Sequence, residues 1–188
     1  NLKNKIMDVI LISNYYDYYF DCFVPKALFL GCSTWWLLLE GVTLKGLIQR
    51  VSEASVNVDG SLVGKIDRGI LLLLGVEKSD SQQEADRLLK KVLSYRIFDD
   101  ESGKMNLSLM DIGGALLIVS QFTIVADTKK GLRPGFSLGA APDDGLMLYD
   151  YFVGQAKRSY SKVETGCYGA DMKVSLVNDG PVTFLLEC

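Results

Sequence analysis

Two kinds of hydrophobic pattern follow one another along the chain from residue 44 onward. Apolar runs of strand length, alternating or continuous, occupy residues 44–51, 54–58, 61–66, 69–76 and 115–127. Asp59-Gly60 separates two of these runs and is a typical two-residue hairpin turn. The run at 69–76 is continuously apolar, which predicts a strand buried on both faces.

Two segments with helical periodicity interrupt these strands. Ser81 and Glu84 have the spacing of a capping box, and the apolar residues that follow share one helix face. These residues are Ala85, Leu88, Leu89, Val92 and Leu93. A second helix is predicted over residues 143–160, opened by Asp143 or Asp144. Four of its residues are expected to face inward: Leu148, Tyr151, Phe152 and Ala156.

Two further apolar runs close the chain, at residues 170–178 and 181–187, with Gly180-Pro181 between them. Asn, Asp and Gly between apolar runs are typical of turns, so we predict a hairpin there, with the two runs paired. Seven or eight strands and two helices, joined mostly as hairpins, indicate an α+β fold. We expect a β-rich sheet, part of it barrel-like, with the two helices covering one face.

Residues 1–43 have a different composition from the rest. They combine an aromatic, low-complexity stretch with an uncharged apolar run at residues 27–39. That run is shorter than the roughly 20 residues needed to span a bilayer. We expect residues 1–43 to be an atypical extension, spurious or disordered, and residues 44–188 to form the functional domain. A targeting segment, or a membrane or partner anchor, is the alternative.

The composition excludes several kinds of chemistry. The chain has no histidine, so Ser-His-Asp and Cys-His catalysis and histidine-ligated metals are ruled out. Its four cysteines lack zinc-site spacing, which argues against a zinc site and predicts reduced thiols in a cytoplasmic protein. A net charge of -3 argues against broad nucleic-acid binding, but not against one locally basic site.

Polar residues break the apolar pattern at one place inside the predicted strand 115–127. Ser120, Gln121, Phe122 and Thr123 follow a buried run, where unpaired polar groups cost about 1–3 kcal/mol each. Either the hydroxyls bond to backbone at a strand end, or these groups converge on a ligand. A Gly- and Pro-containing loop follows with three basic residues, Lys129, Lys130 and Arg133. Such a cluster is usually a solvated face, but here it favours a phosphate-bearing ligand.

The motifs SQFT at 120–123 and NDGPVT at 178–183 resemble those of the D-aminoacyl-tRNA deacylase (D-tyrosyl-tRNA deacylase) family. The similarity extends from Leu44 to Cys188 and includes LIQRVSEASV at 47–56, YRIF at 95–98 and GKMN at 103–106. It implies a homodimeric hydrolase that cleaves the ester joining a D-amino acid, or glycine mischarged on tRNA-Ala, to tRNA. Its partner is the 3′ end of aminoacyl-tRNA, with no DNA, membrane or cofactor expected.

The resemblance also implies roles for residues. Ser120, Gln121, Phe122 and Thr123 would line the catalytic site. Asn178, Gly180 and Pro181 would form a chirality filter with a cis Gly-Pro bond, reaching into the partner's site, and Arg50 would fix its orientation. The remaining residues would bind tRNA: Tyr168 and Met172 at the terminal adenosine, and Lys129, Lys130 and Arg133 at phosphates. For Tyr168 and Met172, core packing is the alternative.

The absent histidine fits ester hydrolysis, because an activated ester needs little beyond an oriented water and stabilisation of the oxyanion. We expect backbone N–H groups near Phe122 and Thr123 to bind the oxyanion, and the terminal 2′-hydroxyl of the tRNA to assist. Thr123 has no base to deprotonate it, so we expect a positioning role. Two rival functions remain: an RNA-binding module without activity, and a generic small-molecule esterase or amidohydrolase.

Overall fold

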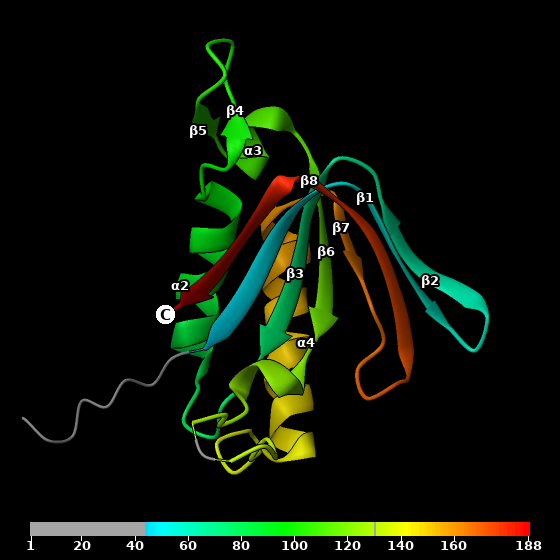
Figure 1. The fold of residues 1–188 in the computed structure, drawn as a ribbon, viewed down its shortest axis with the longest axis vertical. Coiled ribbons are helices and arrows are strands. Elements are labelled where there is room, and N and C mark those ends of the chain that lie inside the picture. The colour runs from blue at the N-terminus through cyan, green and yellow to red at the C-terminus, as the bar shows by residue number, and fades with distance from the viewer. Residues whose placement is uncertain (1–43, 130) are drawn as a thin grey trace, which may run out of the picture. The chain divides into compact units, whose positions relative to one another are not determined.

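The computed structural model describes residues 44–129 and 131–188 (Figure 1). The prediction for residues 1–43 lies outside this part of the chain. The helices are α2 (Gln82–Ser94), α3 (Leu109–Ile112) and α4 (Pro142–Ser159), with the 3₁₀ helix η3 (Phe122–Val125). The strands are β1 (Lys45–Val58), β2 (Ser61–Ile66), β3 (Gly69–Gly75), β4 (Phe98–Asp99), β5 (Met105–Leu107), β6 (Ala115–Ser120), β7 (Val163–Thr165) and β8 (Met172–Glu187).

Most of the strands form one curved sheet with the order β2-β1-β3-β6-β7, and β8 pairs with β1 along nearly its whole length. The β1 pairs are antiparallel, whereas β3–β6 and β6–β7 are parallel. The curvature brings β2 back toward β7. A Cβ added to Gly64 on β2 would lie only 2.6 Å from the carbonyl oxygen of Thr165 on β7. The predicted α+β fold with a barrel-like sheet is confirmed.

The sheet separates two hydrophobic cores. The larger lies between the sheet and the helices α2 and α4, with Phe98 and Phe152 among its fully buried residues. The smaller fills the concave side of the curved sheet and contains Val56, Leu71 and Leu117. Because β3 and β6 contribute to both cores, they are buried on both faces, as the continuous apolar runs predicted.

Several local predictions are confirmed. The Asp59-Gly60 turn joins β1 to β2. The capping box at Ser81 and Glu84 begins α2, and all five apolar residues predicted for its inner face are buried. The second helix occupies the predicted segment, but begins one residue earlier, at Pro142, with Ala141 as N-cap. Asp143 and Asp144 therefore lie in its first turn, where carboxylates interact favourably with the helix dipole.

Four predictions about strands are wrong. The strand predicted over residues 115–127 ends at Ser120, because the chain turns into η3 where the polar residues begin. Residues 170–178 and 181–187 do not pair with each other around Gly180-Pro181. Both halves belong to β8 and pair with β1, which itself joins the two predicted strands 44–51 and 54–58. Hairpins are also fewer than predicted, because the central sheet contains parallel pairs.

Within the described residues, no helix is long and apolar enough to cross a membrane. Nor does this part of the chain bring together three or more side chains of the metal-binding types.

Candidate active site

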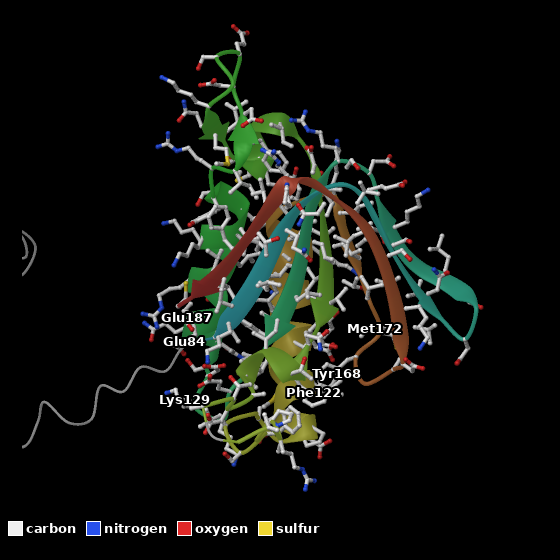
Figure 2. All side chains as sticks on the ribbon, in the orientation of Figure 1. Glu84, Phe122, Lys129, Tyr168, Met172 and Glu187 are labelled. Carbon is white, nitrogen blue, oxygen red and sulfur yellow. The ribbon has the colours of Figure 1, made fainter. Side chains whose placement is uncertain are left out.

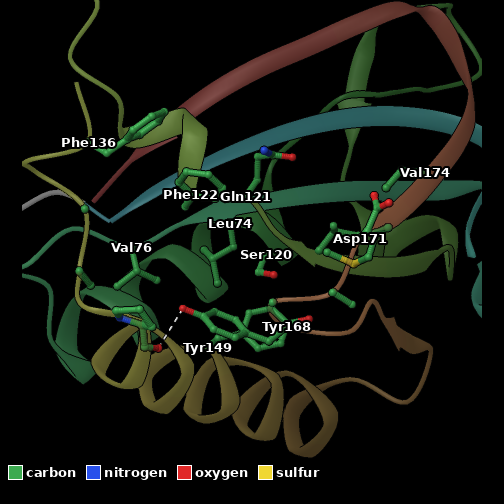
Figure 3. Close-up of a pocket in the computed structure, with 18 residues that line it drawn as sticks. Leu74, Val76, Ser120, Gln121, Phe122, Phe136, Tyr149, Tyr168, Asp171 and Val174 are labelled. Atoms are coloured by element: carbon green, nitrogen blue, oxygen red, sulfur yellow. Dashed lines mark hydrogen bonds between the residues drawn. The ribbon is translucent and has the colours of Figure 1, made fainter. Parts of the chain in front are cut away.

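A pocket of about 480 Å³ opens where β3 and β6 end, beside the N-terminal end of α4 (Figure 3). The loop between β7 and β8 forms its opposite wall. Its lining is largely apolar: Leu74, Val76, Val119, Ser120, Gln121, Phe122, Phe136, Gly139, Ala140, Pro142, Gly145, Tyr149, Tyr168, Gly169, Ala170, Asp171, Met172 and Val174. A concave apolar pocket at the carboxyl ends of parallel strands is a typical ligand site.

The SQFT motif lies where the chain leaves β6. The Gln121 N–H donates to the Leu74 carbonyl at 2.8 Å, which extends the pairing of β3 and β6 by one bond before η3 begins. Ser120 and Gln121 are half-buried in the pocket wall, and Phe122 is 65% exposed at its mouth. The exposed Thr123 does not line the pocket. Its Oγ1 accepts a hydrogen bond from Gln121 Nε2 at 2.6 Å, so Gln121 holds this hydroxyl in place.

Two tyrosines form the floor of the pocket. Tyr149 on α4 donates its hydroxyl to the Ile118 carbonyl on β6, and Tyr168 donates to the Pro142 carbonyl, both at 3.1 Å. Their ring centroids lie 5.5 Å apart. Gly145 makes this arrangement possible, because a Cβ there would overlap the Tyr168 hydroxyl. Met172 also lines the pocket, and its Sδ accepts from the Cys167 N–H at 3.3 Å.

Burial raises the pKa of both tyrosines, and nearby carboxylates, Asp150 for Tyr149 and Asp143 for Tyr168, raise each pKa further. Both phenols therefore stay neutral near pH 7 and serve as hydrogen-bond donors and apolar surfaces. Neither can act as a general base there.

The basic loop lies at the same end of the molecule as the pocket (Figure 2). Asp127 and Gly135 pair through two backbone hydrogen bonds of 2.7 and 2.9 Å, which close the loop at its base. Lys129 and Arg133 are exposed on it, whereas Lys130 lies outside the described residues. Phe136 follows the loop, and its ring centroid lies 5.1 Å from that of Phe122. Two exposed basic side chains thus lie on the loop that precedes Phe136 of the pocket lining.

The predicted filter residues lie elsewhere on the subunit. Asn178 pairs with Val51, and Val51 pairs with Gly69 at the start of β3, whereas the pocket lies beyond Leu74 at its other end. Five residues at about 3.3 Å each place the two regions roughly 16 Å apart. The bend of β1 and β8 accordingly lies at the upper end of Figure 1, and Phe122 at the lower end in the same orientation of Figure 2.

The bend around Gly180 is held by side chains. The Gly180-Pro181 peptide bond is cis, and Gly180 has a φ of 142°. The buried guanidinium of Arg50 donates through Nε to the Asp179 carbonyl at 2.8 Å and through an Nη to the Ile97 carbonyl at 2.7 Å. Asn178 Oδ1 accepts from the Val182 N–H at 2.7 Å. Backbone that has lost part of its strand pairing is thus held in one conformation.

Sequence reasoning missed two aromatic residues of the pocket, Tyr149 and Phe136. Tyr149 lies three residues before Phe152, so the inward helical spacing could have identified it. Phe136 carries no such periodic signal, because it lies in an irregular loop.

The family model described as D-Tyr-tRNA(Tyr) deacylase matches residues 47–187. A D-aminoacyl-tRNA deacylase of Pectobacterium carotovorum subsp. carotovorum (strain PC1) is 60% identical over 141 residues, covering 75% of this chain and 97% of the relative. One from Stutzerimonas stutzeri (strain A1501) is also 60% identical, over 144 residues, covering 77% of this chain and 99% of the relative.

Solved structures show the same fold. One titled c-Myc DNA Unwinding Element Binding Protein has a TM-score of 0.74 at 40% identity, covering 77% of this chain and 98% of its own. A structure titled as that of a probable eukaryotic D-amino acid tRNA deacylase has a TM-score of 0.70 at 17% identity, covering 78% of this chain and 100% of its own. At this identity the likeness supports the fold alone. By its sequence, from the first strand to the last, the chain belongs to the D-Tyr-tRNA(Tyr) deacylase family.

Proposed function

We propose that this protein hydrolyses the ester bond of D-aminoacyl-tRNA and releases a free D-amino acid and tRNA. The observation that carries this proposal is the identity of about 60% to D-aminoacyl-tRNA deacylases over 97–99% of their length. We also propose that residues 44–188 form the catalytic domain and that residues 1–43 are dispensable. Because the substrate is a tRNA, the cytoplasm is the proposed location.

Hydrolysis requires water to attack the ester carbonyl carbon and the C–O bond to the terminal ribose to break, with the ribose oxygen leaving as a hydroxyl. The first N–H groups of η3, on Phe122 and Thr123, precede its first internal hydrogen bond and are available to the oxyanion. In the absence of histidine, the terminal 2′-hydroxyl of the tRNA assists the water. Thr123 has a positioning role, since its hydroxyl accepts from Gln121 and has no base beside it.

The pocket suits the terminal adenosine of a tRNA. Adenine is a flat ring, and Tyr168, Met172 and Phe122 offer aromatic and polarisable surfaces for it. Lys129 and Arg133, with Lys130, are suited to contact the phosphates that follow. A small basic patch of this kind is compatible with an overall net charge of -3.

The chirality filter operates across a homodimer in this proposal. Within one subunit the bend at Gly180-Pro181 is too far from the pocket to touch the amino acid, so a second copy must supply it. Exposed apolar side chains on β8, at Val177, Phe184 and Leu185, suit such an interface. Close backbone at the substrate Cα excludes an L side chain, and a difference of about 4 kcal/mol gives roughly thousand-fold discrimination.

Glycyl-tRNA, including glycine mischarged on tRNA-Ala, is a second proposed substrate. Glycine has no side chain for the filter to exclude, so its ester fits the same site.

The test is hydrolysis of D-tyrosyl-, L-tyrosyl- and glycyl-tRNA by the full chain without added metal. We expect rapid release of D-tyrosine and glycine while the L ester is spared. A folded protein that binds the tRNA without cleaving either enantiomer would favour the RNA-binding module. Equal cleavage of both enantiomers and of simple aryl esters would favour a generic esterase.

A further inference from the structure

The side chain of Thr183 lies at the centre of a small hydrogen-bond cluster beside the β8 bend. Its Oγ1 accepts from Asn178 Nδ2 at 2.9 Å and from Gln49 Nε2 at 3.4 Å. The same Asn178 amide accepts the Val182 N–H through its oxygen. One amide group thus connects the two sides of the bend, and Thr183 supplies the partner for its nitrogen.

The β8 bend needs such support because its strand pairing is interrupted. Gln49 pairs with Thr183 and Val51 pairs with Asn178, so four residues of β8 lie opposite the single residue Arg50. Pro181 has no N–H to donate, which further reduces the backbone bonds that could fix the segment. Side chains must therefore determine where the Gly180 backbone lies.

Arg50 and the Asn178–Thr183 pair hold the bend through separate contacts. Arg50 reaches the Asp179 carbonyl from the β1 side and is buried. The Asn178 amide instead spans residues 178–182 and lies near the surface, with Thr183 exposed beside it. With the Thr183 hydroxyl removed, Asn178 would keep only one of its two anchoring bonds and could rotate toward solvent.

We propose that Thr183 is a positioning residue for enantiomer selection: through Asn178 its hydroxyl fixes the Gly180-Pro181 backbone that excludes L substrates. This inference rests on the proposed deacylase function. A looser bend that still occupies the site leaves more room for an L side chain, whereas the D substrate keeps its contact with the bend. Loss of the hydroxyl therefore increases cleavage of the L ester far more than it changes cleavage of the D ester.

The experiment compares T183V, which keeps the shape but removes the hydroxyl, with T183S, which keeps the hydroxyl. The readout is the ratio of kcat/KM for D-tyrosyl-tRNA to that for L-tyrosyl-tRNA. We expect T183V to lower this ratio by about fivefold or more, the effect of losing one hydrogen bond, and T183S to preserve it. S175A removes a hydroxyl from the same strand away from the bend and is the matched control.

A ratio in T183V that falls by less than about fivefold overturns the inference, as does a T183S variant that loses as much selectivity as T183V. Amide hydrogen exchange at Val182 provides a readout that does not depend on activity, and we expect T183V to accelerate it while T183S does not. Unchanged exchange contradicts the role of Thr183. A wild-type protein that fails to distinguish the enantiomers contradicts the proposed function instead, and the exchange measurement still tests the bend.

Discussion

A side chain at Gly180, the glycine of the proposed filter, would have little space. A Cβ at this position would lie 2.6 Å from Val182 Cγ2 and 3.2 Å from Arg50 Nη2, and its φ of 142° disfavours any L residue. We expect Gly180→Ala to displace the bend, destabilise the fold by about 1–2 kcal/mol and lower D-ester hydrolysis at least tenfold. Thermal unfolding and single-turnover hydrolysis measure the two effects.

Gly103 provides the matched control for Gly180. It also has a positive φ, 75°, but a Cβ there would meet nothing within 4 Å. Gly103→Ala should therefore keep its activity, and its backbone cost should be smaller because L residues adopt a φ near 75° more readily than one of 142°. If both variants lose activity equally, the bend has no special role.

A variant at Thr123 tests whether its hydroxyl acts as a nucleophile or only helps to position the reacting groups. Its hydroxyl accepts from Gln121 Nε2, a group that cannot remove a proton, so it is not activated as a nucleophile. We expect Thr123→Ala to lower kcat for D-tyrosyl-tRNA by about tenfold or less. A fall of several orders of magnitude in a variant that still folds and binds substrate would show that the hydroxyl takes part in the chemistry.

For single residues, the sequence predicted which residue types belong to the site better than it predicted where each side chain lies. Ser120 and Gln121 were identified because they are polar residues after a buried run, and both line the pocket. Thr123 has the same sequence signal but lies outside the lining, because η3 rotates it away from the wall. No periodicity in the residues indicates such a rotation.

Among the elements, the loop before α2 contains an unusual carboxylate. Asp80 Oδ2 accepts from the Glu77 N–H, while the buried Oδ1 has no hydrogen-bond partner in the described structure. Burial, with smaller contributions from Glu77 and Glu84, raises the pKa of Asp80 to about 6. Because the pKa of Asp80 is higher in the folded than in the unfolded protein, ionisation of this carboxyl destabilises the fold. The free energy of unfolding therefore falls as the pH rises from about 4 to about 6.

We therefore expect Asp80→Asn to stabilise the protein at pH 7 by about 1 kcal/mol, a value reduced for the partial exposure of the group. The gain should disappear below pH 4, where Asp80 is protonated in both states. Urea unfolding at pH 4, 5, 6 and 7 measures it, and the exposed Asp67→Asn controls for removal of a charge. A gain that does not vary with pH would mean that ionisation of Asp80 is not its cause.

Elements with a local sequence signal were predicted well, and those that depend on distant pairing were not. The α2 capping box involves residues three apart, and the structure confirms it. By contrast, Gly180-Pro181 has all the local features of a hairpin turn, yet β8 continues through it. Together the two halves of β8 form more pairs with β1 than they could form with each other, so the distant pairing decides.

At the scale of the whole molecule, the surface of a single subunit does not identify the dimer interface, because single exposed apolar residues are normal on protein surfaces. Leu185 on β8 is 51% exposed, so Leu185→Asp should leave the subunit folded while disrupting the proposed dimer. Light scattering should show a monomer, with D-ester hydrolysis reduced by about two orders of magnitude. Leu62→Asp, at a similarly exposed position on β2, should leave both unchanged. A fully active monomer would contradict the proposal.

A shared site makes a stricter prediction for mixed dimers. Ala170→Trp obstructs the pocket and Gly180→Ala displaces the bend, so each homodimer should keep at most about a tenth of the wild-type activity. The two proteins are unfolded and refolded together to form mixed dimers. In a mixed dimer the Gly180→Ala subunit has an intact pocket and the Ala170→Trp subunit has an intact bend. Two-fold symmetry brings this pocket and this bend to the same site. Random pairing should then restore about a quarter of the wild-type activity. If each site instead used the pocket and bend of its own subunit, the activity of the mixture would not exceed that of the two homodimers.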